Sequence, residues 1–169
     1  QAIGAKYKGK NVGTIGDCGI FSFQETKSLS TGEGGMLVTD DDKIMEVARL
    51  VRNHGEAIHE NQEQRSYKTE ILGWGYRMTE LEAAIGISQL EKLPDHNKTR
   101  NELAQYLTEC IDKIEGFNHV KREYVEHAYW FYAFTFDESK IGISREDFVK
   151  AINAEGIPFG QGYVKPLYF

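Results

Sequence analysis

The chain has 169 residues, 40% of them hydrophobic and 27% charged, which is the composition of a folded globular protein and not of a disordered one. Its formal net charge of -6 is unlike the basic balance of nucleic-acid-binding proteins. No apolar run approaches the roughly 20 residues that cross a bilayer, and Cys18 and Cys110 lack the CxxC spacing of zinc and redox sites. We therefore expect a cytoplasmic protein with no nucleic-acid, membrane or metal partner. Because the chain starts at Gln1 without methionine and stops at VKPLYF, we also expect an internal or C-terminal piece of a longer protein.

The first part of the chain predicts two short strands separated by a polar loop. GIFSF (19–23) and MLVT (36–39) are rich in β-forming residues, and the segment between them is rich in Ser, Thr and Gly. A helix is expected next, because aspartates precede it, Gly55 follows it and apolar residues recur at helical spacing. Those apolar residues are Ile44, Val47, Ala48 and Val51.

The second part predicts a long polar loop over residues 56–70 and then three helices and a strand. The first helix starts at a capping-box pattern, Thr79 and Glu82, and is expected to stop before Pro94. NELAQYLTECIDKI (101–114) predicts a separate helix, HAYWFYAFTFD (127–137) a well-covered strand, and SREDFVKAINAEG (144–156) a last helix with a cap at Ser144 and Asp147.

This order of elements predicts an α/β chain with a domain boundary near Pro94. Residues 1–94 are expected to belong to a large α/β domain, and residues 95–169 to a smaller, incomplete α+β domain.

The loop after the first strand carries Lys27 between Thr26 and Ser28, with Ser22 before it and Gly-Glu-Gly-Gly (32–35) after it. A lysine in a sheltered loop can form a Schiff base with an aldehyde cofactor. Hydroxyls and glycine N–H groups could then hold the phosphate of that cofactor. The Walker spacing is absent, so the loop does not predict a nucleoside-triphosphate site. From chemistry alone, a solvated surface lysine remains an alternative.

Two blocks of sequence resemble the DegT/DnrJ/EryC1/StrS family of PLP-dependent, fold-type-I sugar aminotransferases. The first is GDCGIFSFQETKSLSTGEGGMLVTDDDKIMEVARLVRNHG, and the second is GWGYRMTELEAAIGISQLEKL. The likeness covers nearly the whole chain and is strongest over residues 1–93.

The resemblance implies part of a fold-type-I large domain with its smaller C-terminal domain, pyridoxal 5'-phosphate as cofactor, and a homodimer with shared active sites. Lys27 matches the Schiff-base lysine and proton shuttle, Ser22 the serine that binds the cofactor phosphate, and Gln1 the residue near the ring hydroxyl. GWGYRM resembles a segment that reaches the partner's phosphate region, which makes Arg77 a candidate there. The implied reaction moves an amino group from an amino acid, with glutamate expected, to a keto-sugar that is expected to be nucleotide-linked.

Two departures from the family pattern stand out. The aspartate that pairs with the pyridine nitrogen would lie three residues before Gln1, outside this chain, so the chain by itself is expected to be inactive. The asparagine common before Tyr-Arg-Met is Gly75 here.

Three other functions remain open. A sugar dehydratase (a lyase) shares the fold, but those relatives carry histidine in place of the lysine. A keto-cyclitol aminotransferase and a PLP-binding regulatory domain are also compatible with the sequence.

Several further residues have two readings. His54 suits either an active-site wall or a helix end, and with His59 it offers too few ligands for a metal. The aromatic run Tyr129–Phe136 is interpreted as core, and Gly160–Tyr163 as either a bare turn or a substrate contact.

Overall fold

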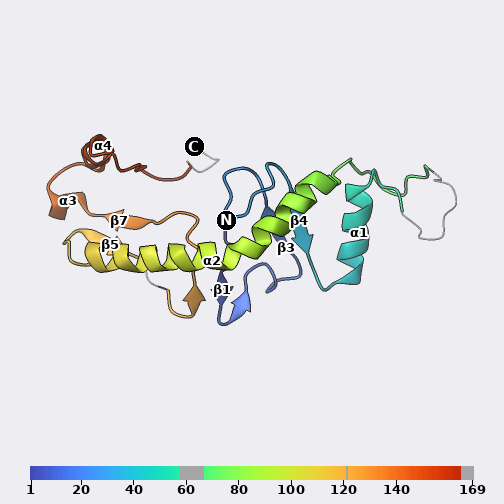
Figure 1. Ribbon diagram of the computed structural model, residues 1–169, viewed down its shortest axis with the longest axis horizontal. Helices are drawn as coiled ribbons and strands as arrows, with labels where there is room; N and C mark the ends of the chain where they lie inside the picture. The colour runs from blue at the N-terminus through green and yellow to red at the C-terminus, as the bar shows by residue number, and fades with distance from the viewer. Residues whose placement is uncertain (58–66, 121, 165–169) are drawn as a thin grey trace. The chain divides into compact units, whose positions relative to one another are not determined.

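The computed structural model describes residues 1–57, 67–120 and 122–164. The elements follow in the order β1 (Lys6–Tyr7), β2 (Lys10–Asn11), β3 (Gly19–Ser22), β4 (Gly35–Val38), α1 (Asp42–Arg52), α2 (Glu80–Ile111), β5 (Phe117–His119), β6 (Val125–Glu126), β7 (Phe134–Phe136), α3 (Glu138–Ile141) and α4 (Arg145–Ala154) (Figure 1). They form two compact units, one from Gln1–Glu102 and Arg122–Phe131, the other from the described part of Leu103–Lys121 and Tyr132–Phe169.

The two strands predicted on either side of the lysine loop are confirmed. β3 and β4 pair antiparallel, with Gly19 opposite Val38 and Ser22 opposite Gly35. The loop over residues 23–34 therefore joins two paired strand ends, which brings Ser22 next to the Gly-Glu-Gly-Gly turn. A small second sheet in the same unit has the strand order β2-β1-β6, with both pairs antiparallel.

Helix α1 is also confirmed, together with its cap. The Asp41 carboxylate accepts hydrogen bonds from the backbone N–H groups of Lys43 and Ile44 at 2.8 and 3.1 Å. These bonds satisfy two donors that the first turn of a helix leaves without helical partners.

Helix α2 corrects the prediction of two helices that are separated at Pro94. One helix runs from Glu80 to Ile111 and contains Pro94. Proline removes one helical hydrogen bond, but it does not end this helix, and its neighbour Leu93 is buried at 5% exposure. The capping box at the start is confirmed: the Thr79 N–H donates to Glu82 Oε2 at 2.8 Å, and the Glu82 N–H donates to Thr79 Oγ1 at 3.3 Å.

The core of the first unit lies under the lysine loop. Phe23 and Leu29, from the loop, form a buried cluster with Leu93 of α2, and Ile3, Phe21 and Met78 pack against it. Burying a side chain of this size contributes about 1.5–3 kcal/mol. The loop is thus held to α2 on both sides of Lys27.

In the second unit β5 pairs antiparallel with β7, and an aromatic cluster packs there. Phe117 lies within 5.1–5.4 Å, between ring centroids, of Phe134, Phe136 and Phe148. The strand predicted over residues 127–137 is shorter than expected: only Phe134–Phe136 is strand. Tyr129 has a φ of 43°, which an extended strand does not allow.

Some expectations concern features that the structure leaves open. The loop predicted over residues 56–70 lies partly outside the described residues, and so does His59. The assignment of residues 1–94 and 95–169 to two domains of the whole protein stays a prediction. Within the described part of the chain, no helix is long and apolar enough to cross a membrane.

Candidate active site around Lys27

A tight turn fixes the backbone of Lys27. Its N–H donates to the carbonyl of Gln24 at 2.9 Å. The side-chain oxygen of Gln24 accepts from both the N–H and the hydroxyl of Thr26, at 3.0 and 2.7 Å. Gln24 therefore accepts hydrogen bonds within the turn through both its backbone carbonyl and its side chain. These bonds fix the backbone from which the Lys27 side chain extends.

The turn is joined to the glycine-rich segment by the backbone of the loop itself. The Phe23 N–H donates to the Gly34 carbonyl, and the Thr31 N–H donates to the Phe23 carbonyl, both at 2.9 Å. Thr31 is only 4% exposed. Gly34 has a φ of 140°, and a Cβ there would lie 2.7 Å from Met78 Cε and 2.8 Å from Thr31 Oγ1. The backbone conformation and the space both favour glycine at this position.

Trp130, which the sequence patterns assigned to the core, lies against the lysine. Lys27 Nζ is 4.9 Å from the centroid of the Trp130 ring. The indole Nε1–H donates to the Thr26 carbonyl at 2.8 Å. A lysine ammonium at this distance from an indole face is attracted by the negative face of the ring. No local sequence signal could have identified this contact, because the two residues are far apart in the chain.

Gln1 lies within electrostatic reach of Lys27. The main-chain nitrogen of Gln1 lies close enough to Lys27 for an electrostatic interaction with the charge of that side chain. The structure therefore brings together two of the four predicted site residues, Gln1 and Lys27.

The two serines near the lysine differ in their surroundings. Ser22 is exposed at the end of β3, and its hydroxyl accepts from the Gln24 N–H at 3.4 Å. The hydroxyl oxygen of Ser28 is buried and has no hydrogen-bond partner among the described residues. A buried hydroxyl without a partner costs free energy, so Ser28 marks a place where a polar group would be stabilised. This set of groups suits a phosphorylated aldehyde: the lysine amine would bind the aldehyde, and the serine hydroxyls would bind the phosphate.

Arg77 is held at the end of α1. Its Nη1 donates to Asn53 Oδ1 at 2.7 Å, and Asn53 Nδ2 donates to the Glu56 carbonyl at 3.0 Å. Asn53 is only 7% exposed. Its pairing with Gly75 as a β-bridge joins the Arg-Asn-His-Gly and Gly-Trp-Gly-Tyr-Arg-Met motifs in space. The predicted role of Arg77 at a partner's phosphate stays a prediction.

Gly75 leaves room for the ring of His54. A Cβ at position 75 would lie 3.0 Å from His54 Cε1 and 3.3 Å from Nε2. Gly75, which stands where the family pattern has asparagine, is therefore the residue next to the His54 imidazole. Of the two readings of His54, the helix-end one matches its position just after α1.

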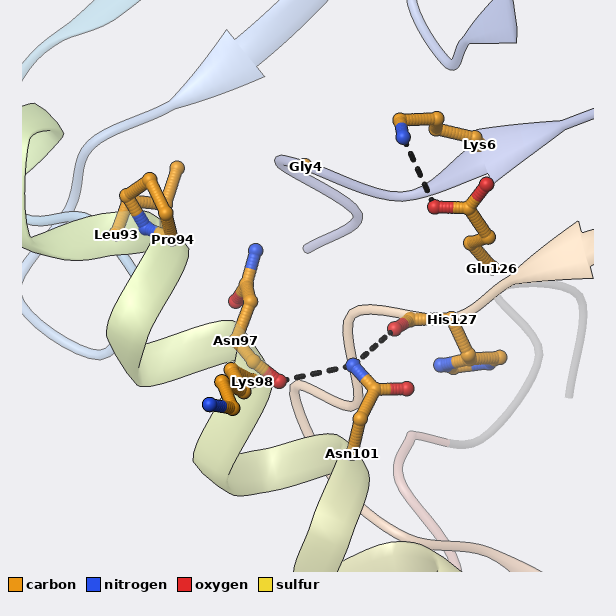
Figure 2. A pocket seen from close by; sticks show the side chains of 9 residues that line it. All are labelled: Gly4, Lys6, Leu93, Pro94, Asn97, Lys98, Asn101, Glu126 and His127. Carbon is orange, nitrogen blue, oxygen red and sulfur yellow. Dashed lines mark hydrogen bonds and ion pairs between the residues drawn. The ribbon is translucent and has the colours of Figure 1, made fainter. Parts of the chain in front are cut away.

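A separate cavity of about 340 Å³ lies in the first unit, away from these residues. In Figure 2, Asn101 of α2 donates to the carbonyls of Asn97 and His127, both at 2.8 Å, and Lys6 pairs with Glu126 at 2.9 Å. Its lining consists of Gly4, Lys6, Leu93, Pro94, Asn97, Lys98, Asn101, Glu126 and His127. None of the four predicted site residues is part of it.

Comparisons with known proteins agree with the resemblance seen in the sequence. The model of the DegT/DnrJ/EryC1/StrS aminotransferase family matches residues 1–169. An uncharacterised protein of Methanocaldococcus jannaschii is 37% identical over 163 residues, which are 93% of this chain and 42% of that protein. GDP-perosamine synthase of Caulobacter vibrioides is 35% identical over 161 residues, which are 93% of this chain and 41% of the synthase. The chain thus spans about two fifths of the length of these curated relatives.

Solved structures give the same result for the fold. An aminotransferase of this family from Brucella abortus has a TM-score of 0.83 and 28% identity, over 99% of this chain and 42% of that one. GDP-4-keto-6-deoxy-D-mannose-3-dehydratase of E. coli, solved with bound hydrated PLP, has a TM-score of 0.81 and 29% identity, over 92% and 43%. The predicted α/β chain, part of the fold of PLP-dependent transferases, is confirmed.

Proposed function

We propose that this chain, which belongs to the DegT/DnrJ/EryC1/StrS aminotransferase family, supplies the cofactor-bearing lysine of a PLP-dependent sugar aminotransferase. The observation that carries the proposal is the setting of Lys27, half-buried on a turn that is hydrogen-bonded to Gln24 and lies against the Trp130 ring. A solvated surface lysine would lack this support.

The residues around the lysine have distinct roles in the proposal. When bound, pyridoxal phosphate supplies an aldehyde that joins the lysine amine and a ring that accepts electrons. Lys27 holds the cofactor through Nζ, Ser22 and the neighbouring loop N–H groups bind the phosphate, and Gln1 lies at the ring hydroxyl. Lys27 Nζ, when it is not bonded to the cofactor, would take the proton from the substrate carbon that bears the nitrogen, as a general base, and deliver it to the C4′ carbon of the cofactor, as a general acid; the transfer to the keto-sugar would use the same two carbons in the opposite direction.

The substrate proposed is a keto-sugar, nucleotide-linked, with glutamate as the amino donor. Two relatives that share 35% and 39% identity with the chain are GDP-perosamine synthases, and a similar solved structure holds GDP-perosamine. A keto-cyclitol is the alternative acceptor. Because the dehydratases of this fold use histidine where this chain has Lys27, the lysine favours amino transfer over dehydration.

The first experiment asks whether Lys27 carries the cofactor. The protein that contains this chain is incubated with PLP and reduced with borohydride, and the peptides are analysed by mass. We expect a phosphopyridoxyl group on Lys27. The label should be absent from a Lys27→Ala variant and retained by a Lys43→Ala variant, because Lys43 is an exposed lysine of α1. A folded protein without label on Lys27 would contradict the proposal.

A second measurement separates the two reactions of the fold. The protein is given glutamate and a GDP-linked 4-keto sugar, and the mass of the sugar product is measured. An amino sugar together with 2-oxoglutarate supports amino transfer, whereas a deoxygenated keto-sugar would show that the chain belongs to a dehydratase despite Lys27.

A further inference from the structure

We propose that Trp130 is a positioning residue for Lys27: its indole face holds the lysine ammonium, and its N–H holds the turn that carries the lysine. This inference rests on the proposed function, in which Lys27 must leave the cofactor and return to it. It adds a role for a residue that belongs to neither of the two sequence blocks that carry the family resemblance.

The argument starts from two contacts made by one side chain. Lys27 Nζ lies 4.9 Å from the ring centroid, inside the range of about 6 Å in which a cation is attracted to an aromatic face. The indole Nε1 donates to the Thr26 carbonyl at 2.8 Å. The first contact acts on the end of the lysine side chain, and the second acts on the backbone one residue before it.

The chain around Trp130 is partly packed. Ala128 is buried at 2% exposure. Phe131 meets the indole edge to face, with ring centroids 5.2 Å apart. Trp130 itself is half-buried and lies outside the buried cluster of Phe23, Leu29 and Leu93.

The consequence concerns the moments when the Lys27 amine is not bonded to the cofactor. A lysine side chain has four rotatable bonds, so when it is free it samples many conformations. A contact that holds the ammonium in one place restricts the side chain to a few of them. Once Nζ has taken the proton, the resulting ammonium is held by the indole and stays near the atom to which it must deliver that proton. Trp130 is therefore expected to act on kcat, and much less on the KM of the amino donor.

The contact itself can be tested without catalysis. Lysines of the PLP-free protein are reductively methylated with ¹³C-formaldehyde, and the Lys27 signal is identified by its loss in a Lys27→Arg variant. An indole below the methylated ammonium should shift its proton resonance upfield. We expect the upfield shift to disappear in Trp130→Leu, to persist in part in Trp130→Phe, and to be unchanged in Trp74→Leu, the control at the other tryptophan. An unchanged shift in Trp130→Leu would overturn the inference.

The role in the reaction is tested by fluorination, which weakens the negative face of the indole and largely keeps its shape. Proteins that contain mono-, di- and trifluorotryptophan should show a graded fall in kcat, reaching roughly threefold to thirtyfold. The donor KM should stay within about twofold. The Trp130→Phe protein grown on the same fluorotryptophans controls for other tryptophans and should show no gradation. If kcat ignores fluorination in the unmutated protein, the positioning role is refuted.

These results are distinguishable from failure of the proposed function. If borohydride fixes no PLP on Lys27, the aminotransferase proposal fails, while the resonance shift still reports whether indole and lysine meet. If the label is present but Trp130→Leu changes neither the shift nor kcat, the positioning inference alone is overturned.

Discussion

Replacing Asn53 by alanine tests the connection between the end of α1 and the Arg77 segment. The change removes the acceptor of a 2.7 Å bond from Arg77 Nη1 and the donor of a 3.0 Å bond to the Glu56 carbonyl. A hydrogen bond from a charged group contributes about 1.5–3 kcal/mol and a neutral one about 0.5–1.5 kcal/mol. Because Asn53 is only 7% exposed, water does not readily replace these partners. We expect a loss of about 2–4.5 kcal/mol in unfolding free energy.

The assay combines a thermal melt with hydrogen exchange measured by mass spectrometry. Exchange should increase in residues 53–57 and 74–77, whose backbones are bonded to each other: the His54 N–H donates to the Trp74 carbonyl at 2.9 Å. Asn11→Ala, at an exposed asparagine of β2, is the matched control, and its effect should stay within about 0.5 kcal/mol.

A double-mutant cycle decides whether the Asn53–Arg77 bond is responsible. Asn53→Ala and Arg77→Met should show a coupling of about 1.5–3 kcal/mol, because each variant removes the same bond. If the two effects simply add, the bond carries no net stability and the reasoning is wrong.

Three further predictions concern a helix end, a glycine and the shared site. Hydrogen bonds from the N–H of Thr79, and then from its side chain, lower the pKa of the Glu82 carboxylate below 4.5. The ionised carboxylate therefore stabilises the protein above pH 4.5, and this stabilisation is lost as the pH falls through the lowered pKa. The unmutated protein should melt at a higher temperature than Glu82→Gln above pH 4.5, and the difference should disappear as the pH falls through that pKa. Gly34→Ala should cost about 1–3 kcal/mol, and more than Gly32→Ala, which has open space for a Cβ; equal melting temperatures would refute this. Mixing inactive Lys27→Ala and Arg77→Ala subunits should restore about a quarter of the activity if the two residues serve one site across a homodimer, whereas no recovery in exchanged dimers would place Arg77 elsewhere.

The sequence predicted most of the local structure around the lysine because those signals are local. The β-rich runs on either side of the loop, the aspartate before α1 and the Thr79–Glu82 box depend on neighbours within a few residues. These features are confirmed by β3, β4, the Asp41 cap and the hydrogen bonds of Thr79.

The errors arose where tertiary packing outweighed a local rule. Pro94 predicts the end of a helix, but α2 continues past it, with Leu93 of the same turn in the buried cluster. The run from His127 to Asp137 alternates like a strand, yet a positive φ at Tyr129 breaks it before Phe134. The aromatic pattern also predicts a core position for Trp130, because a hydrophobic pattern does not show which distant side chain a ring meets.

The hydrogen bond from Trp130 to the Thr26 carbonyl has a consequence for how this family can be studied across species. Its acceptor belongs to the main chain, 104 residues away, so residue 26 can drift in evolution without breaking the bond. Methods that find contacts from pairs of positions that change together would therefore miss this pair. A constraint of this kind leaves its trace at one position only, and a comparison of homologues should find it as an aromatic preference at residue 130 without a matching preference at residue 26.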